Sequence, residues 1–172
     1  MKTILVLACL LLLSTIALSQ TRSRSTRRGT PPARASAQQA SSEARTAGAT
    51  KVADQIKNLT RFVYLLGGVA KGIEQVDEAA RKNEASPVAL QQNAQNKATV
   101  KTSLENVRLG LDQLEIYFRS TPELQGYYTK LVGSASGAAA AEDQAAAGHF
   151  DQAGRTLLGV VNRLTDVLLL MR

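Results

Sequence analysis

Apolar side chains recur at alternating intervals of four and three residues through the second part of the chain. That spacing returns a side chain to the same face of an α-helix, so it predicts amphipathic helices. The expected helices span residues 51–82, 87–119, 122–147 and 151–171. Their core stripes are Val52, Ile56, Leu59, Val63, Leu66, Ala70 and Ile73; Val100, Leu104, Val107, Leu111, Leu114 and Phe118; Leu124, Tyr128, Leu131, Ala135 and Ala138; and Ala153, Leu157, Val160, Leu164, Val167 and Met171. No segment shows the alternation that is typical of a β-strand.

Polar residues stand where three of these helices are expected to begin. Thr50 precedes the first stripe, and Ser86 and Thr121 each precede a proline, which suits the first turn of a helix. The segment Ala147–Ala153, followed by Leu157, resembles the turn and second helix of a tetratricopeptide-type hairpin over less than one repeat. This resemblance implies a tight turn between the last two helices.

Four helices joined by short loops predict an all-α fold, an up-down-up-down four-helix bundle with coiled-coil-like heptad packing. This topology gives the bundle two unlike ends. One end collects bulky side chains: Phe62, Tyr64, Tyr117, Phe118, Tyr127 and Tyr128. The other end is expected to have a core of alanines: Ala79, Ala80, Ala89, Ala94, Ala98, Ala138 to Ala141 and Ala145 to Ala147. Because alanine buries little area, the alanine end should open first.

Residues 1–19 have the form of a secretory signal peptide. Lys2 precedes an apolar run, and small residues at Ala17 and Ser19 predict cleavage before Gln20. The sequence therefore predicts export to the periplasm or the extracellular space. The arginines that follow the apolar run favour an alternative, an uncleaved N-terminal membrane anchor. Cys9 is the only cysteine, so a cleaved chain would have no thiol and no disulfide.

Residues 20–50 carry six arginines, one acidic residue and no aromatic or large aliphatic side chain. Such a composition buries too little apolar surface to offset chain entropy, so it predicts a disordered basic linker. The arm could contact polyanions, in a non-specific and salt-dependent way. Without aromatic side chains to stack on bases, sequence-specific nucleic-acid binding is not expected. The candidate polyanion contacts are Arg22, Arg24, Arg27, Arg28 and Arg34. The preferred interpretation is nevertheless that the arm is a simple spacer.

The residue combinations that carry catalysis or bind a cofactor or a metal are not found. His149 is the only histidine, and roughly 33 Å of helix would separate it from Met171, so the two cannot share one haem iron. The acidic group Glu74, Asp77 and Glu78 lies beside lysines and arginines at the spacing of surface ion pairs. The sequence therefore predicts a non-enzymatic protein without cofactor or metal.

Asn58 begins a glycosylation acceptor pattern, which has meaning only in a eukaryotic secretory protein. The sequence leaves its modification open.

Two leucines near the C-terminus lie on faces of the last predicted helix that otherwise carry polar residues. Leu169 and Leu170 are therefore expected to face solvent and to form a contact surface, with Tyr127 in support. The function expected from these features is an exported interaction or scaffold module that binds a protein partner or a second copy. Two alternatives stay open. One is tethering to acidic polymers or anionic membranes through the basic arm, and the other is binding of a small apolar ligand inside the bundle.

Overall fold

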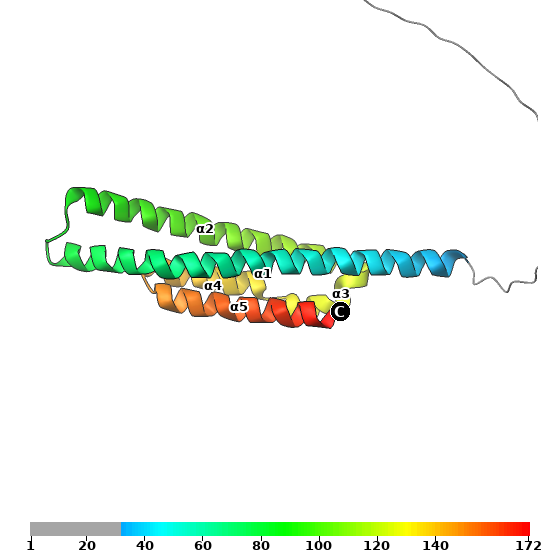
Figure 1. The fold of residues 1–172 in the computed structure, drawn as a ribbon. Helices are drawn as coiled ribbons and strands as arrows, with labels where there is room; N and C mark the ends of the chain where they lie inside the picture. Colours follow the sequence, from blue (N-terminus) through cyan, green and yellow to red (C-terminus); the bar gives the residue numbers. More distant parts are fainter. Residues whose placement is uncertain (1–31) are drawn as a thin grey trace, which may run out of the picture.

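The computed structural model describes residues 32–172, with side chains from residue 36 onward. Within this range the chain forms helices and no strand (Figure 1). The elements are α1 (Pro32–Arg81), α2 (Pro87–Ser120), the short 3-10 helix η1 (Pro122–Leu124), α3 (Gln125–Leu131), α4 (Ser134–Ala146) and α5 (Phe150–Leu170). For these residues, the expectation of an all-α chain with four packed helices is confirmed. The predicted signal peptide and the first part of the predicted linker lie outside the described residues.

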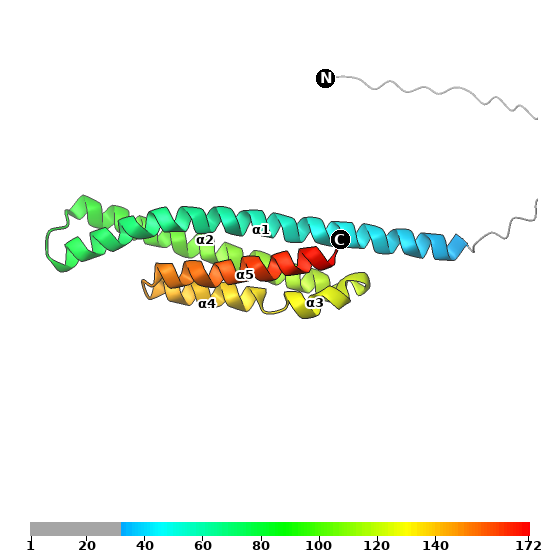
Figure 2. The ribbon, with the colours of Figure 1, turned by 60° about the horizontal axis from the view of Figure 1, so that its bottom comes forward.

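The four long helices surround one hydrophobic core. α1 packs against α2 and α5, and α4 packs against the same two helices. Successive long helices run in opposite directions (Figures 1 and 2). The predicted stripes supply the core: each stripe residue is buried except four that are half-buried against it, namely Ile56, Val63, Val107 and Tyr128. The hydrophobic pattern therefore identified the buried face of every long helix.

The first helix is longer than the sequence pattern indicated. We expected a linker over residues 20–50 and a helix from residue 51, but α1 begins at Pro32. Residues 32–50 are rich in alanine, the best helix former, and they extend an existing helix, which needs no new nucleation. Local bonds support this part: Gln39 donates to Glu43, and the Thr46 and Thr50 hydroxyls donate to carbonyls one turn earlier.

Of the three predicted N-caps, only Ser86 is confirmed: Thr121 makes no side-chain cap bond, and Thr50 lies inside α1. The Ser86 hydroxyl accepts a hydrogen bond from the Ala89 N–H at 3.2 Å, and Pro87 opens α2, as predicted. α1 ends at Arg81, and Asn83 in the turn that follows has a φ of 59°, in the left-handed region. The tight turn predicted between the last two helices is present, with Gly148 at a φ of 81°.

The third predicted helix, residues 122–147, is wrong as one element because it is broken into η1, α3 and α4. Gly133, at a φ of 91°, ends the run that α3 began. The backbone groups freed by the break find partners on other helices. A Glu115 carboxylate oxygen on α2 accepts from the Ala135 N–H at 2.9 Å, and Arg163 on α5 donates to the Val132 carbonyl at 3.1 Å.

The two ends of the bundle differ, although not in every residue expected. Tyr64 was placed in the bulky end, but its side chain points into solvent. Five alanines were placed in the alanine core but are exposed: Ala94, Ala98, Ala140, Ala146 and Ala147. The buried position in this part of α2 is Asn93, one heptad before Val100. The stripe of α2 thus continues through a polar residue rather than through alanines.

Candidate interaction surface

The C-terminal end of α5 presents apolar side chains to solvent, as predicted. Leu169 is 53% exposed and Leu170 is 55% exposed, whereas Val167 and Met171 beside them are buried. These two leucines are adjacent on a helix, so their side chains point about 100° apart. Leu169 follows Leu158 by three turns on the outward face of α5. Leu170 follows Arg163, whose bond to Val132 marks the side of α5 that faces α3.

The N-terminal part of α1 reaches this end of the bundle without covering the leucines. Gly48 is buried there, and a Cβ at this position would lie 2.9 Å from a methyl group of Leu124 and 2.9 Å from the Met171 methyl group. This close approach explains a glycine inside a helix. α1 therefore completes the core at Met171 and leaves Leu169 and Leu170 exposed.

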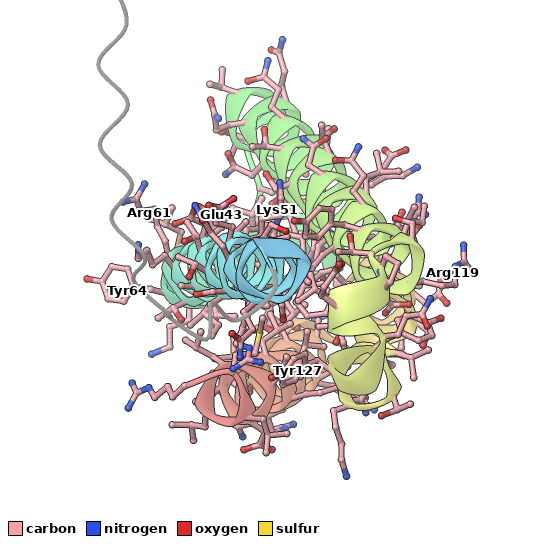
Figure 3. All side chains as sticks on the ribbon, turned by 90° about the vertical axis from the view of Figure 1, so that its right-hand side faces the viewer. Glu43, Lys51, Arg61, Tyr64, Arg119 and Tyr127 are labelled. Atoms are coloured by element: carbon pink, nitrogen blue, oxygen red, sulfur yellow. The ribbon has the colours of Figure 1, made fainter. Side chains whose placement is uncertain are left out.

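Tyr127 contributes less to this surface than predicted. Its side chain is half-buried and packs against the core. Figure 3 places Tyr127 between α3 and the end of α5, beneath α1. The leucines are therefore the larger part of the surface at this end.

The predicted polyanion contacts are not placed by the structure. Arg22, Arg24, Arg27 and Arg28 lie outside the described residues. Arg34 lies in the first turn of α1, and its side chain is also outside them. Between residues 36 and 50, one arginine is balanced by one glutamate.

A cleft of about 640 Å³ opens at the other end of the bundle, where α2 passes the C-terminal end of α4. Its walls combine apolar and charged side chains: Asp77, Lys97, Ala98, Val100, Lys101, Leu104, Glu142, Asp143, Ala145, Ala146, Ala147, Gly148 and Phe150. The Arg108 guanidinium holds Glu142 at 3.2 Å. No serine, cysteine or histidine lines the cleft, so it offers none of the usual nucleophile–base pairs.

Three polar side chains form a cluster beside this cleft, and the sequence reasoning missed it. One carboxylate oxygen of Asp77 accepts from the Asn93 amide and from the Lys97 ammonium, both at 2.7 Å. We expected Asp77 to lie on an exposed acidic face, but it joins α1 to α2. The sequence feature that could have predicted this cluster is the spacing of seven residues between Asn93 and Val100, which places Asn93 in line with the core stripe of α2.

Glu78, by contrast, behaves as predicted for an acidic residue of the helix surface. Hydrogen bonds from the Arg81 side chain and then from Lys82, with the charge of Arg81, lower the pKa of its carboxyl group. Both partners lie within one turn, at the C-terminal end of α1, where cations suit the helix dipole. This arrangement is ordinary surface pairing within one helix.

The described residues form neither a metal site nor a membrane-spanning helix. Across residues 32–172, no three histidine, cysteine, aspartate or glutamate side chains gather closely enough to hold a metal ion. No helix in that range combines the length and the apolar character needed to cross a membrane. His149 is exposed at the start of α5. No family model, curated protein or solved structure matches the chain.

Proposed function

We propose that this chain is an exported, non-enzymatic helical module that binds a protein partner through the end of its bundle. The observation that supports the proposal is the exposure of Leu169 and Leu170 in a helix whose core stripe is already complete. Exposed apolar side chains that do not serve the fold are typical of contact surfaces. Coiled-coil-like packing of the four stripes would hold this end rigid.

The position of the N-terminal part of α1 adds support. The N-terminal segment of the same chain could instead have packed on the leucines. α1 passes the end of the bundle at Gly48 and contacts Leu124 and Met171 instead. Within residues 36–172 the two leucines stay more than half exposed, which supports contact with a second molecule.

Replacing Leu169 and Leu170 with glutamate tests this function. Because both side chains are exposed, helical content and thermal melting should stay nearly unchanged, as for most surface substitutions. Protein partners cross-linked to the whole chain in envelope and secreted fractions should be lost. The matched control is Leu109→Glu with Ile116→Glu, which changes two exposed apolar residues of α2 and should keep those partners.

Two outcomes would contradict the proposal. If the Leu169→Glu, Leu170→Glu variant unfolds, the leucines belong to the core in solution. If it folds and captures the same partners as the unmodified chain, the contact surface lies elsewhere.

A further inference from the structure

The outward face of α1 carries apolar side chains that are exposed within the described part of the chain. Tyr64 is 83% exposed, Leu65 is 56% exposed and Val69 is 38% exposed. Figure 3 shows Tyr64 pointing into solvent on the side of α1 turned away from α2 and α3. No charged residue occurs between Arg61 and Lys71. This face is therefore free of charges between Arg61 and Lys71, in the C-terminal half of α1.

Two glycines lie on the same face. Gly68 follows Tyr64 by one turn, and Gly72 follows Gly68 by one turn. No atom lies within 4 Å of the position that a Cβ would take at either residue, and neither has a positive φ. Nothing within residues 32–172 thus requires glycine there, although each costs about 1 kcal/mol relative to alanine. A second helix packed on this face would use the missing side chains, because glycine permits close backbone approach.

The charges on either side of the apolar face indicate the orientation of a second helix. Asp54 and Lys57 precede it, and Glu78 and Lys82 follow it; all four are exposed. Each of these two pairs forms an exposed ion pair within the helix, and exposed pairs can exchange partners at little cost. If a second α1 lies antiparallel with Gly68 at the crossing, Asp54 faces Lys82 of the other copy. Lys57 then lies beside the other copy's Glu78. In a parallel pair each charge would face its own like charge, which is unfavourable.

The same antiparallel alignment also places a large side chain of one copy opposite a glycine of the other. Tyr64 and Gly72 lie four residues on either side of Gly68, so the ring of one copy falls on the glycine of the other. A large side chain over a glycine gives close packing at the centre of an interface. The pairing is symmetric, because each copy supplies both the tyrosine and the glycine.

We propose that the outward face of α1, comprising Tyr64, Leu65, Gly68, Val69 and Gly72, binds a second copy of this chain. The two α1 helices cross antiparallel at Gly68, on a two-fold axis. This site is separate from the surface at Leu169 and Leu170, and it does not rest on the proposed function.

Cysteine cross-linking of the whole chain tests the geometry, in a Cys9→Ser background. Gly68→Cys lies at the crossing and should form a disulfide-linked dimer under mild oxidation. Arg61→Cys and Gln75→Cys should each stay monomeric, because identical positions in the two copies would be roughly 21 Å apart along the helix. A disulfide needs Cα atoms within about 7 Å. An equal mixture of these two variants should form the mixed dimer.

Sedimentation equilibrium then tests the surface. Tyr64→Glu with Leu65→Glu should weaken association at least about tenfold, with unchanged helical content, because two carboxylates would be buried without partners. Leu109→Glu with Ile116→Glu on α2, and Leu169→Glu with Leu170→Glu on α5, should leave association unchanged.

Three outcomes would overturn the proposal. The first is a monomeric chain at high concentration with no Gly68→Cys dimer. The second is cross-linking of Arg61→Cys to itself, which would show a parallel pair. The third is equal loss of association in the α1 and α2 glutamate variants.

Discussion

Asn93 is the polar residue that interrupts the core stripe of α2. Only 5% of its surface is exposed, and its amide group donates to Asp77 while the Oδ1 atom has no partner among the described residues. A buried acceptor without a partner destabilises a fold by about 1–3 kcal/mol. A polar residue in a core position can nevertheless select one register of the helices. The bond between Asn93 and Asp77 therefore joins α2 to α1 and leaves one buried oxygen without a partner among the described residues.

Replacing Asn93 with leucine should raise the free energy of unfolding by about 1–2 kcal/mol, measured by urea denaturation. The change removes the unpaired oxygen and buries more apolar surface, while Asp77 keeps its bond to Lys97. Gln91→Leu, at an exposed position two residues away, is the matched control and should change the stability by less than about 0.5 kcal/mol. A less stable Asn93→Leu variant would show that the amide bond to Asp77 outweighs the unpaired oxygen.

At the scale of elements, the break between α3 and α4 is the main departure from regular helices. It depends on Gly133, whose positive φ suits glycine alone at low cost. It also depends on two side chains from other helices, Glu115 and Arg163, which bind the freed backbone groups. The break is thus a tertiary feature with a local requirement for glycine.

Gly133→Ala should lower the free energy of unfolding by about 1–3 kcal/mol, because the new side chain strains the backbone. Its Cβ would also lie 2.6 Å from Nη1 of Arg163 and displace the bond to Val132. Gly148→Ala separates the two effects, since Gly148 has a similar φ but no atom within 4 Å of the Cβ position. It should lose less stability than Gly133→Ala. Equal losses in the two variants would mean that the Arg163 contact contributes nothing.

For the whole molecule, the unequal lengths of the helices decide where stability lies. α1 and α2 are much longer than α4 and α5, so their hairpin extends past the α4–α5 turn (Figure 2). At the other end, α1 extends beyond the bundle (Figure 1). Between residues 74 and 99 the only buried residue is Asn93, and between residues 36 and 47 there is none. Both extensions therefore lack an apolar core.

Amide hydrogen exchange should reveal this gradient. Residues 74–97 should exchange faster than residues 52–73 and 100–118, because local opening exposes little apolar surface there. Residues 36–47 should exchange fastest, since they form a single exposed helix. The measurement is mass spectrometry of the whole chain at a concentration where it is monomeric. Equal protection across α1 would contradict the expectation and show that the bundle opens as one unit.

The periodicity of apolar residues was sufficient to predict the four packed helices and nearly all of their buried faces. It also placed Leu169 and Leu170 at solvent, because a helix of known register has a known outward face. The start of α1 was missed, since the alanines of residues 32–50 bury little area and leave no stripe. The outward face of α1 was missed for the opposite reason: it is apolar, and only packing shows that no other described helix covers it.

What the sequence determined by itself is therefore the set of helices and their buried sides, since both depend on residue spacing within about one turn. The tertiary structure decided the rest. The break at Gly133 rests on Glu115 and Arg163, and the polar cluster on the meeting of Asp77 with Asn93. The exposure of Tyr64 and Leu65 depends on which sides of α1 the other helices occupy. These are contacts between segments far apart in the chain, and no local spacing encodes them.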